Sequence, residues 1–382
     1  MQQRLQTIDK VRGLVMLIMA IDHIRDLFHA TSLTQDPTDL ATTTPLLFFT
    51  RWITHFCAPI FVFLAGTSAY LRQQSKPSRS FLITRGAWLV FLELTVINFG
   101  IWWDVHFNVF LFQVIGAIGI GFIILGLLIN VAAKWLGLAG VLIIILHGAY
   151  ALLPFGANST VQNILNPLFT ITPISFGSNK LFLVAYPVLP WLGIMLVGFG
   201  AGNYFTNEKF AVKKMYRLGL SLLGLFIVLR FTNLLLDPAP WQVQQQPLFT
   251  VLSFLNVTKY PPSLLFALLT IGVMFLLLGL FSNVKNRVGA VLQVYGRVPL
   301  FYYLLHWYIA HSLLFLLLYV HGYSTSQFSF GFNFGGPQNF PGLPLHWVYI
   351  FWAFIVAALY PLCKWFGRYK QDNRHKNWLS YL

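Results

Sequence analysis

Charged residues are scarce in this chain of 382 residues. Asp, Glu, Lys and Arg make up only 9% of it, whereas 57% is hydrophobic and 17% aromatic. Soluble domains contain about 25% charged residues. The scarcity therefore excludes an ordinary soluble fold and indicates an integral membrane protein.

Cysteine is almost absent. Cys57 and Cys363 are the two cysteines of the sequence. They are too few for a disulfide framework, and they lack the spacing of a zinc or haem site. We therefore expect neither a disulfide scaffold nor a bound metal.

Long apolar runs are abundant instead. Ten of them are long enough to cross about 30 Å of hydrocarbon. Basic residues precede the first run but no small-residue cleavage site follows it, so we expect a retained span. The expected fold is all-α: a polytopic membrane protein with about ten transmembrane helices, in a single domain over residues 1–382. The runs fall at about 8–28, 48–71, 81–103, 107–130, 135–153, 182–204, 214–236, 263–283, 297–320 and 346–367.

The positive charges are distributed unevenly over this topology. With the N-terminus in the cytoplasm, 20 of the 25 Lys and Arg residues fall on the inner side, including a basic tail at about 368–382. This bias predicts that both termini are cytoplasmic in a plasma (inner) membrane. It also accounts for most of the net charge of +15, so we expect the lipid bilayer and no nucleic acid as a partner. The five outer cations are Arg25, Arg51, Lys180, Arg230 and Lys259.

The first span carries a cation and a titratable base. Arg12 and His23 are eleven residues apart, which in an α-helix is about 16 Å and about 20° past three full turns. Both side chains therefore lie on one face. An arginine near an inner helix end commonly extends to the interface. The spacing to His23 favours a functional role for Arg12 over that alternative.

Other ionisable residues lie at the outer level of His23, among them Asp22 and Asp26. Asp26 is three residues from His23 and can contact it. A carboxylate beside an imidazole raises its basicity, as a general base requires. In the second span Arg51 and His55 are four residues apart and can orient an acceptor or stabilise an oxyanion. The alternative for this group is a set of polar residues in the headgroup region.

Two ionisable groups lie deeper in apolar segments. Glu93 needs a partner or a proton there, and a structural pair with an arginine or histidine is the favoured interpretation. For His306, a helix–helix hydrogen bond and a place along a substrate pathway both stay open. Long outer loops are typical of lids or substrate walls, and they are expected at 29–47, 154–181, 237–262 and 321–345.

The opening of the chain resembles a known family. The run Ile8-Asp9-Lys10-Val11-Arg12-Gly13, with His23 following, resembles the start of the transmembrane acyltransferase superfamily. The continuation to Phe28 and the segments 50–59 and 61–66 are similar to a bacterial branch related to heparan-alpha-glucosaminide N-acetyltransferase. The resemblance is strong over residues 4–71, where the first two helices carry the motifs at about 8–71. Beyond residue 71 it is topological.

This resemblance implies acyl transfer across the membrane. Cytoplasmic acyl-CoA, expected to be acetyl-CoA, would be the co-substrate. An extracytoplasmic small molecule or glycan, such as a sugar or amino sugar, would accept the acyl group. Arg12 would meet the CoA phosphates. Arg85 and Arg297 are further candidates among the inner cations, because CoA is polyanionic.

His23 would be the base that deprotonates the acceptor. In the heparan enzyme the position matching His23 resembles an asparagine, so His55 and His29 stay open for this role. Two other functions stay open as well. A proton-coupled transporter or exporter can use the same polar cavity, although no clear two-fold hydropathy symmetry supports it. A lipid-binding or assembly factor would carry these residues for structure. A homo-oligomer is compatible with the sequence.

Overall fold

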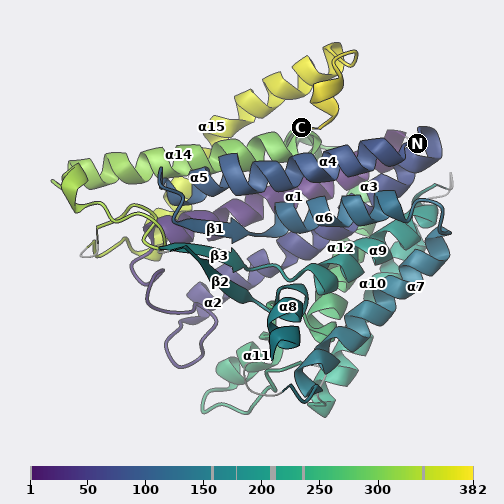
Figure 1. Ribbon diagram of the computed structural model, residues 1–382, viewed down its shortest axis with the longest axis horizontal. Helices are drawn as coiled ribbons and strands as arrows, with labels where there is room; N and C mark the ends of the chain where they lie inside the picture. Colours follow the sequence, from purple (N-terminus) through teal and green to yellow (C-terminus); the bar gives the residue numbers. More distant parts are fainter. Residues whose placement is uncertain are drawn as a thin grey trace. The chain divides into compact units, whose positions relative to one another are not determined.

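The computed structural model describes residues 2–155, 159–177, 179–206, 212–234, 237–337 and 340–381 (Figure 1). The chain forms two compact units. Unit 1 comprises Met1–Thr7, Ala58–Leu94 and Leu111–Asn283. Unit 2 comprises Ile8–Cys57, Thr95–Phe110 and Val284–Leu382. The expectation of a single domain over residues 1–382 stays a prediction.

The described residues are mostly helical, as the sequence predicts. Eight of their helical segments are long and apolar enough to cross a membrane. They are Pro45–Ser75, Arg79–Trp102, Ala133–Leu152, Val188–Phe205, Val212–Thr232, Leu264–Ser282, Pro299–Val320 and Leu345–Asp372. Each coincides with one of the ten predicted spans. The chain is therefore a multi-pass membrane protein.

The remaining two predicted spans are helices with a weaker membrane signal. Helix α1 (Gln2–Phe28) has 27 residues, but Arg12, Asp22, Arg25 and Asp26 interrupt its apolar stretch. Helix α6 (Val114–Leu127) is apolar but has only 14 residues. The count of ten spans and the cytoplasmic termini stay predictions.

Three helix pairs form most of unit 1: α4 with α6, α7 with α9 and α10 with α12 (Figure 1). Two glycines face each other where the helices of each pair touch. A side-chain carbon on either glycine would crowd the backbone of the partner helix, so these positions require glycine. Lipid tails are as apolar as the helix surfaces, so the hydrophobic effect does not drive helices together in a membrane. Small residues let the backbones approach closely, and van der Waals packing then stabilises the pair. The facing glycines are Gly86 and Gly119, Gly140 and Gly193, and Gly219 and Gly272. The helices of unit 1 are α3 (Cys57–Ser75), α4 (Arg79–Leu92), α6, α7 (Ala133–Leu146), α8 (Thr160–Phe169), α9 (Val188–Gly200), α10 (Val212–Thr232), α11 (Pro247–Leu255) and α12 (Leu264–Ser282), with short helices η3 (His147–Leu152) and η4 (Ala201–Phe205).

A small sheet adds to the expected all-α fold. Strand β2 (Thr172–Phe176) pairs antiparallel with β3 (Lys180–Val184), so that Thr172 faces Val184 and Phe176 faces Lys180. The sheet order is β1-β3-β2, with β1 spanning Val109–Phe112. Gly177 has a φ of +63° beside β2, a conformation that glycine adopts without strain. The sequence predicted an irregular loop over 154–181, and α8 and this hairpin occupy most of it.

A buried ion pair holds the loop that follows α10. Arg230 is 1% exposed, and its guanidinium lies 4.0 Å from the Asp237 carboxylate. The Asp237 oxygens also accept hydrogen bonds from the hydroxyls of Thr258 (2.8 Å) and Ser263 (2.5 Å). Arg230 additionally donates to the backbone oxygens of Phe254, Ala239, Ser253 and Asn256. Arg230, predicted as an outer cation, therefore organises this loop.

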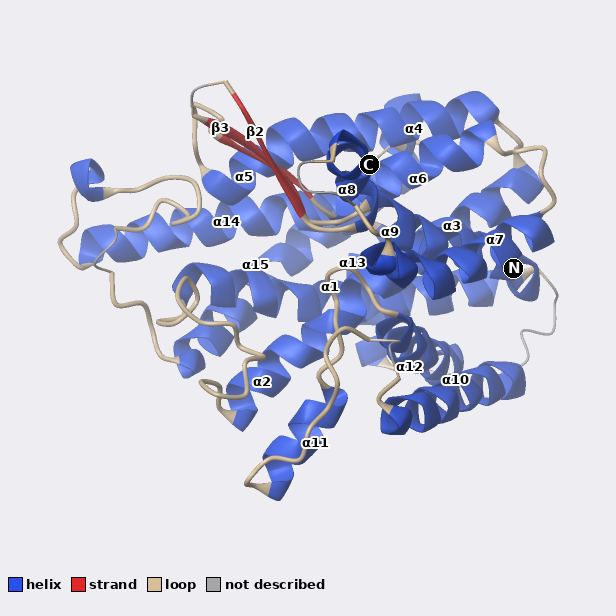
Figure 2. Cartoon of the chain, turned by 60° about the horizontal axis from the view of Figure 1, so that its bottom comes forward, coloured by secondary structure: helices blue, strands red, loops and turns tan. Residues whose placement is uncertain are grey.

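Unit 2 packs three other helices around α1. Gly13 of α1 meets the backbone oxygen of Leu292 in α13, and Gly296 of α13 meets that of Asp9, so neither position has room for a side chain. The indole of Trp352 in α15 donates to the Leu17 oxygen at 2.8 Å. Helices α14 and α15 lie side by side (Figure 2). The elements of unit 2 are α1, α2 (Pro45–Trp52), η1 (Ile53–Phe56), α5 (Asn98–Trp102), α13 (Arg287–Arg297), α14 (Pro299–Val320), η5 (Thr325–Gln327), α15 (Leu345–Asp372) and η6 (Asn377–Ser380).

Candidate functional site

The His23 imidazole makes a hydrogen bond with a second imidazole. Its Nδ1 lies 2.7 Å from Nε2 of His306 on α14. The His23 ring also stacks on Trp307, with centroids 4.4 Å apart and an angle of 21° between the planes. His306 is fully buried. The helix–helix hydrogen bond considered for His306 is thus present, and its partner is the predicted base.

The carboxylates near His23 bind arginines. The guanidinium of Arg25 donates through Nη2 to Oδ1 of Asp22 at 2.9 Å and to Oδ1 of Asp26 at 2.6 Å. Arg51 donates to the other oxygen of Asp22. Charge-assisted hydrogen bonds of this kind are strong and directional. They give two cations and two anions a fixed arrangement on the turn of α1 that contains His23.

Arg51 and His55 do not belong to one regular α-helix. Arg51 lies in α2, whereas His55 lies in the tighter 3₁₀ segment η1 that separates α2 from α3. The hydroxyl of Thr54 donates to the Arg51 backbone oxygen at 2.6 Å, within this segment. The spacing of four residues predicted a common α-helical face for the pair. The 3₁₀ turn changes that geometry, because side chains there repeat every three residues.

The N-terminal half of α1 carries several cations. Nη1 of Arg12 lies 3.7 Å from Oδ1 of Asp9, and both side chains are about one-fifth exposed. Arg297 of α13 and Lys370 of α15 are also close enough to stabilise the Asp9 charge. The structure therefore brings together two of the predicted CoA-binding residues, Arg12 and Arg297. Arg12 is the ion-pair partner of Asp9, and the charges of Arg297 and Lys370 act on the same carboxylate, so positive charges outnumber the negative one here.

Arg85, the third candidate for CoA, lies in unit 1. Its guanidinium is 5.6 Å from the ring centroid of Phe122 and 5.9 Å from that of Phe81. Such cation–π contacts stabilise a positive charge in an apolar environment. The role of Arg85 in CoA binding stays a prediction.

Glu93 binds the N-terminus of a helix, and its partners among the described residues include no arginine or histidine. Its carboxylate accepts from the backbone N–H groups of Gln113 and Gly116, where α6 begins. Anionic groups are stabilised at helix N-termini by the unpaired N–H groups and the helix dipole. The predicted pair with an arginine or histidine is wrong, because the partners of Glu93 in the structure are backbone N–H groups. Glu93 itself begins a short π-helical segment, Glu93–Ile97.

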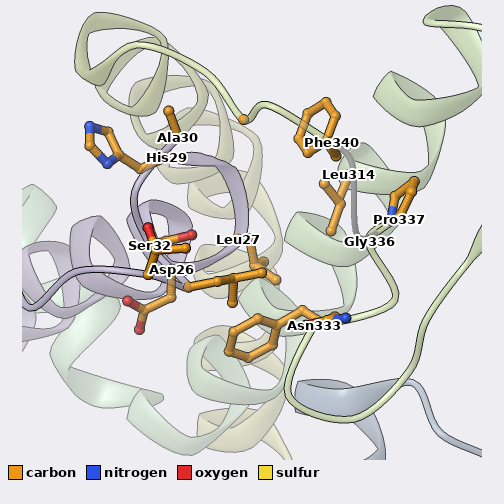
Figure 3. A pocket seen from close by; sticks show the side chains of 14 residues that line it. Asp26, Leu27, His29, Ala30, Ser32, Leu314, Asn333, Gly336, Pro337 and Phe340 are labelled. Carbon is orange, nitrogen blue, oxygen red and sulfur yellow. The ribbon is translucent and has the colours of Figure 1, made fainter.

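A pocket of about 330 Å³ opens where α1 ends. Figure 3 shows Asp26, His29 and Ser32 on one side of it and Pro337 and Phe340 on the other. The further lining residues are Leu27, Ala30, Leu33, Thr34, Leu314, Asn333, Phe334, Gly336 and Gly342. Hydroxyl, amide and carboxyl groups thus share the pocket with two phenylalanine rings.

Backbone hydrogen bonds join the two walls of this pocket. The N–H of Leu343 donates to the Phe28 oxygen at 2.6 Å, and the N–H of Ala30 donates to the Leu343 oxygen at 3.1 Å. The loop that follows α14 is thereby fixed to the end of α1. The sequence predicted a substrate wall or lid over 321–345, but no signal in it indicated the attachment to α1.

His29 lies just beyond the end of α1, at the edge of the pocket. Its Nδ1 is 3.3 Å from the N–H and 3.1 Å from the hydroxyl of Thr31. Burial and, secondarily, the positive charge of Arg25 lower the pKa of the His29 imidazole below its ordinary value. The ring is therefore held in its neutral form at neutral pH.

These features define a multi-pass membrane protein with a polar, titratable cluster on an otherwise apolar helix. The sequence model of the family described as heparan-alpha-glucosaminide N-acetyltransferase, catalytic, matches residues 4–229, more than half of the chain. The chain belongs to this family, which confirms the resemblance. It is therefore a membrane transferase of the N-acetyltransferase type. No curated protein matches the chain.

The family match covers only part of the site. It includes the His23 cluster, Arg51 and His55, but it ends at residue 229. His306 and the loop that closes the pocket lie beyond it. Their roles can be argued only from the geometry of unit 2.

Proposed function

We propose that the protein transfers an acyl group, expected to be acetyl, from cytoplasmic acyl-CoA to an extracytoplasmic acceptor such as a sugar or amino sugar. The observation that carries the proposal is α1 itself, in a member of this transferase family. The helix is unbroken from Arg12 to His23 and has a cationic cluster at one end and a hydrogen-bonded imidazole near the other. A regular helix separates the two by about 16 Å. Helix α1 therefore connects the proposed phosphate-binding residue Arg12 to the proposed base His23.

The cluster around Asp9 is the proposed site for the CoA phosphates. Arg12 of α1 pairs with Asp9, and Arg297 of α13 and Lys370 of α15 lie near enough for their charges to act on that carboxylate. Phosphate groups bind arginine through paired N–H groups, and the positive excess attracts a polyanion. Arg85 stays a further candidate. The predicted cytoplasmic position of these residues agrees with a donor that is made in the cytoplasm.

The proposed reaction uses His23 as a general base. The acceptor hydroxyl or amine attacks the thioester carbonyl carbon, the new O–C or N–C bond forms, and its proton passes to His23. The tetrahedral intermediate then collapses, the C–S bond breaks, and the CoA sulfur takes the proton from His23. The products are the acylated acceptor and free CoA. Because the base is regenerated, no other reactant is needed.

Arg25 and Arg51 both bind Asp22, the residue that precedes His23 in α1. Either can stabilise the oxyanion of the intermediate. Asp22 holds both guanidinium groups at once, so it fixes their positions before substrate binds. Such preorganisation lowers the reorganisation needed when charge develops in the transition state.

The pocket beyond α1 is the proposed acceptor site. Asp26 lines it and lies three residues after His23 on the same helix, so the pocket begins about one turn from the base. Its volume of about 330 Å³ lies at the lower end for small-molecule pockets. Polar groups beside the rings of Phe334 and Phe340 suit a sugar, whose hydroxyls form hydrogen bonds and whose C–H face packs on aromatic rings.

The direct test is thioester consumption by the purified protein in lipid nanodiscs. We expect free CoA to appear from acetyl-CoA only when an acceptor is added, with glucosamine, glucose and an N-acetylated sugar as the first panel. Mass spectrometry of the acceptor should show one acetyl group added. Uptake of the acceptor into proteoliposomes without any CoA release would refute the proposal and support a transporter.

A further inference from the structure

Two histidines and one backbone oxygen form a continuous chain in unit 2. Nδ1 of His23 lies 2.7 Å from Nε2 of His306, and Nδ1 of His306 lies 3.3 Å from the backbone oxygen of Tyr302. His306 and Tyr302 are both fully buried. A backbone oxygen can only accept a hydrogen bond. This fixed acceptor at one end determines which atom donates in each hydrogen bond of the series.

The direction follows from the protonation states open to His306. If Nδ1 carries the proton, it donates to Tyr302, and Nε2 accepts from the Nδ1–H of His23. If instead Nε2 carries the proton, the Nδ1 lone pair faces the lone pairs of the Tyr302 oxygen. If both nitrogens carry protons, a full charge is buried, and none of the ion pairs among the described residues includes His306. Only the first state allows both hydrogen bonds, from His23 to His306 and from His306 to the Tyr302 oxygen.

We propose that His306 is the positioning residue that holds His23 in the tautomer with its proton on Nδ1 and its lone pair on Nε2. This inference rests on the proposed function in one respect: it identifies Nε2 as the atom that takes the acceptor's proton. The other ring nitrogen of a catalytic histidine is commonly bound to a group that sets its tautomer. A carboxylate or a backbone oxygen usually has that role, and here a backbone oxygen acts through a second imidazole.

Ring packing keeps the two imidazoles in register. The His306 ring is nearly parallel to Tyr302, with 11° between the planes and 5.6 Å between centroids, and it lies edge to edge with the His23 ring, with 22° and 5.0 Å. The indole ring of Trp307 packs on the His23 imidazole, with centroids 4.4 Å apart. Rotation of either ring would break these contacts as well as the hydrogen bond. Ring packing on both histidines therefore adds to the hydrogen bond in fixing their orientation.

A second buried histidine on α14 provides a natural contrast. His311 is also fully buried, but its Nε2–H donates to the backbone oxygen of Phe334 at 3.0 Å. It therefore anchors the loop that carries Phe334. Two histidines in the same helix, both inaccessible to water, thus have separate partners and separate roles.

The test reads the His23 tautomer directly, by ¹⁵N NMR of the histidine rings in protein reconstituted into lipid bilayers. The His23 signals are assigned by their loss in His23→Asn. We expect Nδ1 to carry the proton and Nε2 to be unprotonated in the unmodified protein at neutral pH. A protonated Nε2 with a bare Nδ1 would overturn the proposal, and this reading needs no variant of His306.

Substitutions of His306 test its role separately. His306→Met, similar in length but without a hydrogen-bonding nitrogen, should mix the two His23 tautomers and lower kcat by about 10- to 100-fold. His306→Gln keeps an amide oxygen that can accept from His23, and it should retain the tautomer and most of kcat. His311→Met is the matched control and should leave the His23 ring signals unchanged. Retention of the single tautomer and of full kcat in His306→Met would overturn the inference.

These outcomes separate the inference from the proposed function. If no acceptor supports CoA release, the acyltransferase proposal fails while the NMR result still decides the role of His306. If CoA release is robust and both His306 variants match the unmodified protein, the acyltransferase proposal stands and the positioning role is refuted.

Discussion

Asp22 of α1 accepts hydrogen bonds from two arginines that enter from different elements. Arg25 lies one turn further along α1 and binds one carboxylate oxygen, whereas Arg51 of α2 binds the other. Arg25 is 3% exposed, so its charge must be compensated within the protein. The first two predicted spans are joined through this carboxylate, one residue before His23.

Replacing Asp22 should therefore affect both stability and activity. Asp22→Asn removes the anion that two guanidinium groups share, and hydrogen bonds to charged groups contribute about 1.5–3 kcal/mol each. We expect a clearly lower Tm in nanodiscs and reduced CoA release. Asp26→Asn is the control, because it leaves both arginine contacts of Asp22 in place and its side chain is one-third exposed. Equal losses in the two variants would contradict the central role of Asp22.

Removing the proposed base should abolish transfer without preventing folding. General-base catalysis contributes typically 10²- to 10⁴-fold, so His23→Ala should lower kcat/KM by at least about 100-fold. CoA release measures the loss, and the size-exclusion profile in detergent measures folding. His375→Ala, an exposed histidine in the basic tail, should keep normal activity.

His29→Ala and His55→Ala complete that series, because both histidines are open as the base. If His23→Ala retained activity and one of these variants lost it, the base would have to be reassigned. A loss confined to His23→Ala would exclude both alternatives.

The facing glycines predict a contrast within one helix. A methyl group on Gly219 of α10 would lie 2.7 Å from a side-chain carbon of Leu276 and 2.9 Å from the Gly272 oxygen. Nothing lies within 4 Å of such a group on Gly224, one and a half turns further along α10. Gly219→Ala should destabilise by about 1–3 kcal/mol through overpacking. Gly224→Ala should be neutral or up to about 1 kcal/mol more stable, because alanine favours helices. Thermal unfolding followed by tryptophan fluorescence compares them, and identical shifts would argue against close α10–α12 packing.

The Arg230 network predicts a large and local effect. Arg230→Met would leave Asp237 without its cation and several backbone oxygens without donors, and breaking a buried pair costs about 3–5 kcal/mol. We expect faster hydrogen exchange over residues 237–262 and a lower Tm. Lys180→Met, at an exposed outer cation, is the control and should leave both unchanged. Unaltered exchange in Arg230→Met would show that the loop is held by other contacts.

The His29 pKa predicts how stability depends on pH. Since the folded pKa lies below the unfolded value of about 6.5, the folded state binds fewer protons than the unfolded state just below that pH. The stabilising contribution is fully present above about pH 6.5 and is lost as the pH falls through the folded pKa. His29→Gln should therefore have a flatter Tm profile as the pH falls below about 6.5. Parallel profiles for the two proteins would mean that His29 does not titrate in this range.

Several features of the site were predictable and several were not. The helix that carries Arg12 and His23 and the apolar helices followed from residue spacing and hydropathy, which are local properties. The family followed from the resemblance of the opening segments to a known one. The strands at 172–184 were missed, because a short hairpin within a polar loop has a weak period-two pattern. Arg25 was identified as an outer cation within reach of His29, four residues on. Its two carboxylate contacts were not predicted, since they depend on side-chain rotamers that spacing does not specify.

The order of residues along one helix was enough to place a cation and a base on α1, because helical geometry repeats every 3.6 residues whatever surrounds it. It could not reveal that His23 binds His306, 283 positions away, or that the loop after α14 is fixed to the end of α1. Those pairings arise only when separate helices pack and exclude water, since buried polar groups must then find partners among whatever side chains and backbone oxygens the packing brings within reach.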